Sequence, residues 1–371
     1  MTGHRIGENA AQGTVAGLTP TRANGTLVPY STSYAHASSV RQGISDPRVV
    51  REVWMRRFVP RWSLVLFALS MASCTSAPPP TPVVFDRAPV FDDAFWATWG
   101  DGRAELAGYD LVTPRYGEPR RGTAVTIFVT ETFSDEDRVK ADPGRHGATD
   151  TFPVMKLNLI QDFATGIYDY NLMTSAFVAL TSRHQRPPGG VTKVSFSAQE
   201  WCGHAYAQLL FDARYARFTG HSYFDGEADS TSALPVPNDA LSEDALLMWA
   251  RGFSGPVLAP GDSTTVPLAG SLRQARLTHR KLALTTVHLS RAAASETITV
   301  PAGSLVCDVY TARVEGGRTW TMHVEQAAPH RLAQWTCSDG EQAQLRLLRE
   351  HGARAVGEAG GDDHLEKHLA H

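Results

Sequence analysis

The chain alternates apolar and polar side chains over many short runs, and this period of two constrains the fold most strongly. The clearest run is Gly122–Phe133, where Ala124 and Phe128 fall on one face and Val125 and Ile127 on the other. Successive side chains of a β-strand point to opposite faces, so this run predicts a strand. Similar runs separated by turn residues follow almost to the end of the chain, and they predict a mainly antiparallel β architecture. They lie at 104–112, 152–163, 166–180, 191–201, 205–216, 216–225, 263–268, 277–290, 296–300, 305–315, 318–325, 331–337 and 342–348.

One helix of useful length is predicted, at Ser242–Phe253. Ser242 is suited to cap its first turn, and two acidic residues follow at the positive end of the helix dipole. The hydrophobic-poor stretch 226–241 before it is a candidate boundary between two halves of a folded body that we place at 91–349. The tail at 350–371 is rich in Gly, Ala and charge, and we expect it to be disordered.

The segment Met55–Cys74 has a basic head with three arginines, a short apolar run at Trp62–Leu69 and a small-residue end. This order is typical of a secretory signal peptide, and the apolar run is too short to span a bilayer. Its last four residues, Met71–Cys74, resemble the lipobox of bacterial lipoproteins. The resemblance implies that Cys74 is lipidated and that the chain is anchored in the cell envelope. Because Thr75 rather than Asp follows the cysteine, it also implies an outer-membrane lipoprotein facing the periplasm.

This interpretation divides the N-terminal part of the chain. Residues 1–54 would be a spurious, disordered extension upstream of a true start at Met55, and 55–73 would be the signal peptide. Residues 74–90 would hold the lipidated cysteine and a Pro-rich spacer (Ser76–Pro82) that keeps the body away from the bilayer.

Export would place the other three cysteines in a compartment that permits disulfides. Cys307 and Cys337 lie in neighbouring predicted strands, so they are the candidate disulfide, while a pairing of Cys202 with either remains open.

The second half of the body is similar to exported β-rich proteins of unknown function. The similarity rests on Asp244–Gly252, Pro260-Gly261, Val300–Gly303 and Trp335–Gly340. Such proteins resemble the lipoprotein-carrier fold, which implies a curved antiparallel sheet or partly open barrel around one packed helix, with an apolar concave surface. We therefore expect an apolar cavity under the helix at Ser242–Phe253.

The first half, around 104–131 and 199–204, resembles uncharacterised bacterial envelope proteins whose relatives are sometimes labelled septum-formation inhibitors of the Maf type. Maf proteins have an early Ser-Pro-Arg-Arg phosphate loop. The most similar segment in this chain is Thr113–Tyr116, which lies in a predicted strand with no helix after it. The pyrophosphatase activity of Maf proteins is therefore not inferred for this chain.

The densest polar cluster is Glu200, Cys202 and His204. In a continuous strand these three side chains would share one face, where they could hold a metal or activate a thiolate. No second ligand pair such as Cys-x-x-Cys accompanies them, and a bulge at Gly203 explains the pattern equally well. A structural role is the preferred interpretation, and an envelope hydrolase or metal-binding protein built on this cluster is the alternative.

Charge and motifs limit the functions further. The net charge is -3, no basic block stands out, and His279 is one of several histidines without ligand spacing. Nucleic acid is therefore not an expected partner. No cofactor or metal motif and no serine-hydrolase elbow is present. We expect a lipid-anchored envelope protein that binds an apolar ligand or an envelope partner without catalysis.

Overall fold

A computed structural model describes residues 87–346 and 354–356 of the chain. These residues form one 17-stranded sheet and three short α-helices. The residues predicted as the upstream extension, signal peptide, lipidation site and most of the linker and tail lie outside the described ranges. No helix of the described residues is long and apolar enough to cross a membrane.

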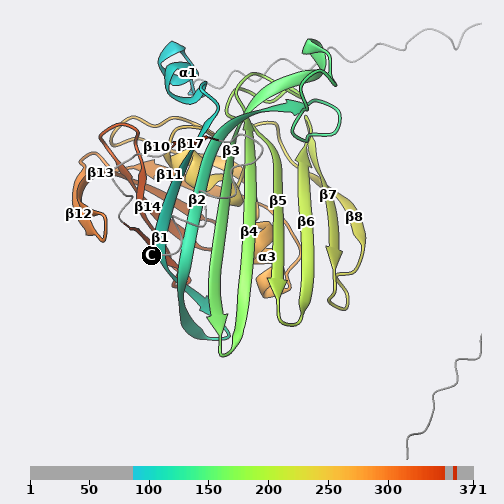
Figure 1. Cartoon of the computed structure of the whole chain (residues 1–371), viewed down its shortest axis with the longest axis vertical. Helices are drawn as coiled ribbons and strands as arrows, with labels where there is room; N and C mark the ends of the chain where they lie inside the picture. The colour runs from blue at the N-terminus through green and yellow to red at the C-terminus, as the bar shows by residue number, and fades with distance from the viewer. Residues whose placement is uncertain (1–86, 347–353, 357–371) are drawn as a thin grey trace, which may run out of the picture. The chain divides into compact units, whose positions relative to one another are not determined.

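The first eight strands form an antiparallel meander in which each strand pairs with the next (Figure 1). In β5, buried and less buried side chains alternate along most of the strand. The strands are β1 (Arg103–Arg115), β2 (Glu118–Ser134), β3 (Thr151–Thr165), β4 (Tyr168–Ala179), β5 (Val191–Glu200), β6 (Gly203–Phe211), β7 (Tyr215–Ser222) and β8 (Ser230–Pro235). β8 lies inside the stretch 226–241, so the candidate boundary contains a strand of the sheet.

The remaining strands continue the sheet on the other side of β1. β16 pairs with β1, and the sheet then runs through β15, β14, β13, β11 and β10 to β9, with β12 also on β13 and β17 also on β1. Their bounds are β9 (Leu241–Ser242), β10 (Ser263–Ala269), β11 (Leu284–Arg291), β12 (Glu296–Val300), β13 (Gly303–Val314), β14 (Thr319–Glu325), β15 (Leu332–Cys337), β16 (Gln342–Leu345) and β17 (Arg354–Val356).

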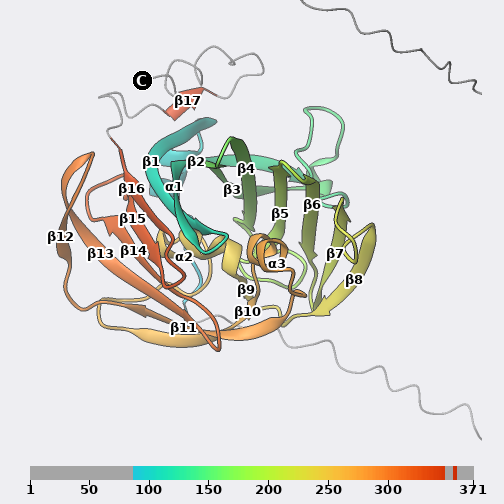
Figure 2. The same cartoon turned by 90° about the horizontal axis from the view of Figure 1, so that it is seen from below.

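The sheet curls so that its two halves face each other, with helices between them (Figure 2). The helices are α1 (Asp93–Trp99), α2 (Leu246–Ala250) and α3 (Leu272–Thr278), and two 3-10 turns are η1 (Ala148–Asp150) and η2 (Glu243–Ala245). The predicted class, a mainly β, curved and open sheet with a packed helix, is confirmed. The structure adds one parallel pair, β9 with β10, and a second interior helix, α3.

The predicted helix at 242–253 is shorter than expected. Ser242 does cap it, because its Oγ accepts a hydrogen bond from the Asp244 amide, but the chain first makes η2 and then the five-residue α2. All five residues of α2 are buried. It therefore fills the interior instead of presenting one apolar side to it.

The second interior helix replaces part of a predicted strand. The run 277–290 was expected to be extended, but α3 ends at Thr278 and β11 begins only at Leu284. α3 is capped by Ser271, whose Oγ accepts a hydrogen bond from the Gln274 amide, and it ends at His279 in the left-handed conformation. Its two arginines, Arg273 and Arg276, are buried, and buried charges do not produce the hydrophobic period of a recognisable helix.

A buried ion pair joins the end of α2 to β1. Arg251 donates from Nη1 and Nη2 to both oxygens of Glu105, at 2.6 and 3.0 Å. Its other donors reach the carbonyls of Pro329 and His330, and its guanidinium lies 4.3 Å from the centroid of the Phe128 ring. Four acceptor oxygens and an aromatic ring therefore surround this cation.

Breaking this pair should cost far more than breaking an exposed one. Glu105→Ala leaves the fully buried Arg251 side chain without its counter-charge, and we expect the free energy of unfolding to fall by about 3–5 kcal/mol. The control is Glu118→Ala, which removes the partner of Arg120 on the surface and should cost less than about 1 kcal/mol. Urea unfolding of both variants measures the difference. Equal losses would show that the buried pair does not hold α2 in place.

Candidate functional site

The predicted polar cluster is a hairpin turn and not a continuous strand. Glu200 ends β5, Gly203 begins β6, and these two residues pair with each other across the turn. Glu200 is buried on the inner face, whereas His204 is exposed on the outer face. The expectation that Glu200, Cys202 and His204 share one face is therefore wrong, because a two-residue turn at Trp201-Cys202 interrupts the alternation.

Glu200 instead belongs to an ion-pair network under α3. Its two oxygens accept hydrogen bonds from Arg276 Nη2 at 2.5 Å and from Arg115 Nη2 at 3.4 Å. The carboxylate side chain is only 1% exposed. Glu200 is thus neutralised by two arginines that fix α3 to β5 and β1, which is a structural role. Across the described residues, no group of three His, Cys, Asp or Glu side chains is placed to hold a metal ion.

The predicted disulfide is not formed, and Cys202, Cys307 and Cys337 are all free thiols. Cys307 of β13 is opposite Glu325 of β14, whereas Cys337 of β15 is opposite Trp320. These two positions on β14 are about 16 Å apart along the strand, far beyond the reach of a disulfide. Burial raises the pKa of Cys307 to about 11 and that of Cys337 to about 12, so neither thiol ionises readily.

The interior beside α2 is filled by side chains. Trp249 donates from its indole nitrogen to the Pro256 carbonyl at 3.0 Å and meets the Tyr310 ring edge to face. Met248 and Ala250 are at most 1% exposed. The cavity expected under this helix is therefore not observed beside α2, and a different cavity lies beside α3.

A cavity of about 550 Å³ lies between α3 and the inner face of β6, β7 and β8. Its apolar wall combines rings and aliphatic side chains from both the sheet and the α3 region. They are Phe196, Ala207, Phe218, Leu234, Leu272 and Leu282. We refer to this space as the α3 cavity.

The α3 cavity exists because the inward positions of the last strands are small. β6 places Ala205 and Ala207 there, and β8 places Ser230 and Ser232 there. Inward positions of β4 and β5 carry Tyr170, Leu172 and Phe196, which fill the interior. The sheet is therefore packed solidly at β4 and β5 and leaves space toward its β8 edge.

One end of the α3 cavity is cationic. Arg276 is 7% exposed, and its Nη1 has no hydrogen-bond partner among the described residues, although the guanidinium lies 3.5 Å from the Phe224 ring centroid. Arg280 and Lys281 follow α3 and are exposed beside the cavity. The one carboxylate lining it, Glu227, accepts a hydrogen bond from His279 at 2.6 Å. The cavity can therefore take an apolar group together with an anion.

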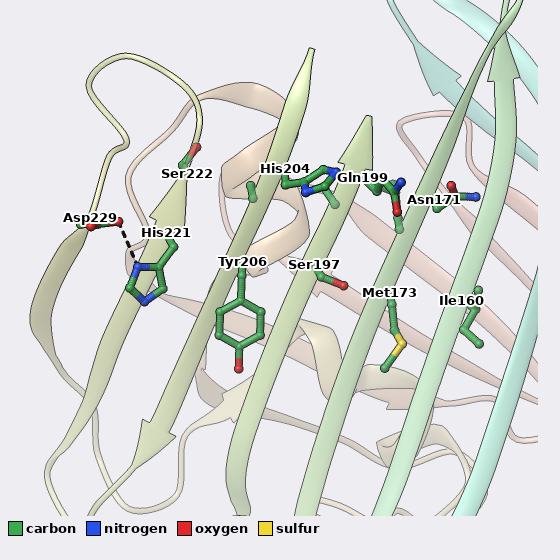
Figure 3. Close-up of a pocket in the computed structure, with 13 residues that line it drawn as sticks. Ile160, Asn171, Met173, Ser197, Gln199, His204, Tyr206, His221, Ser222 and Asp229 are labelled. Carbon is green, nitrogen blue, oxygen red and sulfur yellow. Dashed lines mark hydrogen bonds and ion pairs between the residues drawn. The ribbon is translucent and has the colours of Figure 1, made fainter. Parts of the chain in front are cut away.

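A second hollow, of about 670 Å³, lies on the outer face of β3–β7 (Figure 3). His204, the exposed member of the predicted cluster, lines it together with Tyr206 and His221. His221 shares a hydrogen bond with Asp229 at 3.0 Å. The two hollows share four lining residues of β6 and β7, which are Ala205, Tyr206, His221 and Ser222.

Comparison with known proteins does not assign this chain to a family. No family model matches the chain, and no curated protein matches it. Among solved structures, it is similar to the crystal structure of a beta-barrel-like protein of the domain of unknown function DUF1849 from Brucella abortus. That match has a TM-score of 0.38 and 9% sequence identity, and it covers 66% of this chain and 97% of the other.

Sequence reasoning missed α3 and the residues that follow it. The signals were present: Ser271 is a good capping residue, and the run His279-Arg280-Lys281 is a compact basic group. They were outweighed by the β-branched residues after Leu284, which favour a strand. The small inward residues of β6 and β8 did not predict a cavity, because only the strand register shows that they lie opposite α3.

Asp244 should make stability depend on pH through its contact with α3. Its carboxylate accepts hydrogen bonds from Ser271 Oγ and the Leu272 amide at 2.5 and 2.8 Å. Burial, aided by the nearby Glu243 charge, raises the pKa of Asp244 from 3.8 to about 6. The folded protein thus binds this proton more tightly than the unfolded chain does. Its stabilising effect is present below pH 3.8 and is lost as pH rises through 6.

We therefore expect the free energy of unfolding of the wild type, relative to Asp244→Asn, to fall by roughly 2 kcal/mol between pH 4 and 7. Chemical unfolding at several pH values measures this difference, in which the titration of the other carboxylates cancels. A difference that stays constant with pH would contradict the raised pKa.

Proposed function

We propose that this protein is a lipid-anchored envelope protein that binds an amphiphile carrying an acidic group in the α3 cavity, without catalysis. The observation that carries the proposal is a cavity with an apolar wall and a cationic end beside the open edge of the sheet. Its volume lies in the range of pockets that bind small molecules.

The apolar wall supports binding of a hydrocarbon group. Phe218, Leu234 and Leu282 are only partly buried by the protein itself, so a ligand would remove more of their surface from water. Burial of apolar surface contributes about 25 cal/mol per Å². A chain of methylenes would satisfy this wall without needing hydrogen bonds.

The cationic end supports an acidic head group. Arg276 Nη1 is a buried donor that lacks an acceptor, and a carboxylate or phosphate oxygen would supply one. Arg280 and Lys281 are exposed nearby and would attract an anion as it approaches. Apolar and anionic parts of one molecule would thus be held at the two ends of the cavity.

The predicted lipid anchor supports the same function because it would hold the protein near a membrane. A lipidated Cys74 and the Pro-rich spacer would keep the body close to a membrane, where amphiphiles are concentrated. The alternative, an envelope hydrolase or metal site at Glu200, Cys202 and His204, has no support, because these side chains do not converge.

Blocking the cavity tests the binding site. β8 offers a matched pair of positions, since Ser232 lines the α3 cavity and its neighbour Thr231 points to the outer face. Titration of the full chain with 11-(dansylamino)undecanoic acid, followed by fluorescence, should show saturable binding. Ser232→Trp should weaken it at least about tenfold and Thr231→Trp less than about twofold. Absence of saturable binding, or equal effects of both variants, would refute the site.

Reversing the charge tests the head-group end. The double variant Arg280→Glu/Lys281→Glu should weaken binding of the dansyl acid about tenfold. It should leave binding of the uncharged probe N-phenyl-1-naphthylamine unchanged, because that probe has no anion to lose. Equal loss for both probes would show that these cations do not recognise an acidic group.

Lipidation is tested separately at Cys74. Bacteria expressing the full chain are grown with labelled palmitate, and the labelled protein should partition with the membranes. Cys74→Ala should carry no label. Undiminished labelling of that variant, or none in the wild type, would contradict the anchor.

A further inference from the structure

The hollow on the outer face is built from rows of side chains that cross five strands. Ile160, Met173, Ser197, Tyr206 and His221 lie opposite one another in register from β3 to β7. A second row, one pair along the sheet, contains Asn171, Gln199 and His204, and Figure 3 shows the two rows side by side. With adjacent strands about 4.8 Å apart, the first row extends over roughly 19 Å.

The outer hollow combines apolar and polar side chains and is almost without charge. Of the described residues that line it, none is Lys, Arg or Glu, and Asp229 is the one carboxylate. Its hydrogen-bonding groups are amides, hydroxyls and imidazoles, which both donate and accept. The wall also includes Tyr206, a residue that is 39% exposed.

These features select among ligand classes. A nucleic acid or an anionic membrane surface would need lysines and arginines that the hollow lacks. A neutral polyhydroxylated chain fits both the polar groups and the aromatic ring of the hollow. Its hydroxyls match the amide, hydroxyl and imidazole groups, and the C–H face of a sugar ring stacks on an aromatic ring.

We propose that the outer face of β3–β7 binds a neutral oligosaccharide, with Tyr206 as the stacking platform and Asn171, Gln199, His204 and His221 as the hydrogen-bonding groups. Asp229 fixes the His221 ring through their hydrogen bond. Asn171 is similarly oriented by Asp162, to which its amide donates at 2.7 Å. Gln199 and His204 make no side-chain hydrogen bond within the described part of the chain and are exposed toward the hollow.

The outer hollow and the α3 cavity share Ala205, Tyr206, His221 and Ser222 in their walls. Gln199 lines only the outer hollow, so Gln199→Ala leaves the wall of the α3 cavity in place. Weakened sugar binding in that variant, with unchanged binding of the dansyl acid, therefore separates the two sites.

The test is calorimetric titration of the full chain with chitotetraose and, separately, cellotetraose. We expect saturable binding of at least one of them, weakened at least about tenfold by Tyr206→Ala. The matched control is Tyr215→Ala, which removes a tyrosine of similar exposure, 44%, from neighbouring β7 outside the hollow and should change affinity less than about twofold.

A second variant, Gln199→Ala, should weaken binding about threefold or more, and it keeps the test valid if Tyr206→Ala unfolds the protein. The proposal is overturned if neither sugar binds at about 10 mM. It is also overturned if the folded Tyr206→Ala and Gln199→Ala variants bind as tightly as the wild type, or if the control loses as much affinity as they do.

Discussion

Buried arginine–carboxylate pairs between the interior helices and the sheet are the interactions on which the rest of the structure depends. Arg276 of α3 pairs with Glu200 of β5, and its neighbour Arg273 pairs with Glu341 beside β16, both at 2.5 Å. A buried charge is tolerated only while its counter-charge is in place, so α3 has one position in which both arginines are neutralised. That position determines how far α3 stands from β8, and hence the existence of the α3 cavity.

The two hollows show how one set of strands can carry two chemistries. On the inner face, small side chains of β6 and β8 leave an apolar space next to cations. On the outer face, the intervening residues of the same strands form a mixed apolar and polar surface with almost no charge. The period of two places neighbours such as Tyr206 and Ala207 on opposite faces, but both hollows are lined by Ala205, Tyr206, His221 and Ser222. A change at one of these shared positions therefore acts on both hollows.

The fold was predictable in outline because the alternation of apolar and polar residues can be identified within each short segment of the sequence. Gly122–Phe133 needed no partner to be identified as a strand, and it lies within β2. The site was not predictable, because it depends on pairs of positions far apart in the chain. Trp201-Cys202 is a turn only because Glu200 pairs with Gly203. Cys307 and Cys337 lie in strands that appear adjacent in the sequence, but the register places them opposite the two ends of β14. The helix α3 was not predicted because two of its inward residues are arginines, whose burial depends on pairing with Glu200 and Glu341.

The pairing of β1 with β16 has a consequence for how the chain reaches its native state. The β1–β8 meander joins neighbours, so a growing chain can assemble it strand by strand. The seam at Tyr109 and Leu345 joins the beginning of the body to its end, and such distant contacts slow folding because a long loop must close first. Until β16 arrives, one edge of β1 remains open to pairing with other chains. The last strands to be synthesised thus control both the rate of folding and the period of exposure to aggregation.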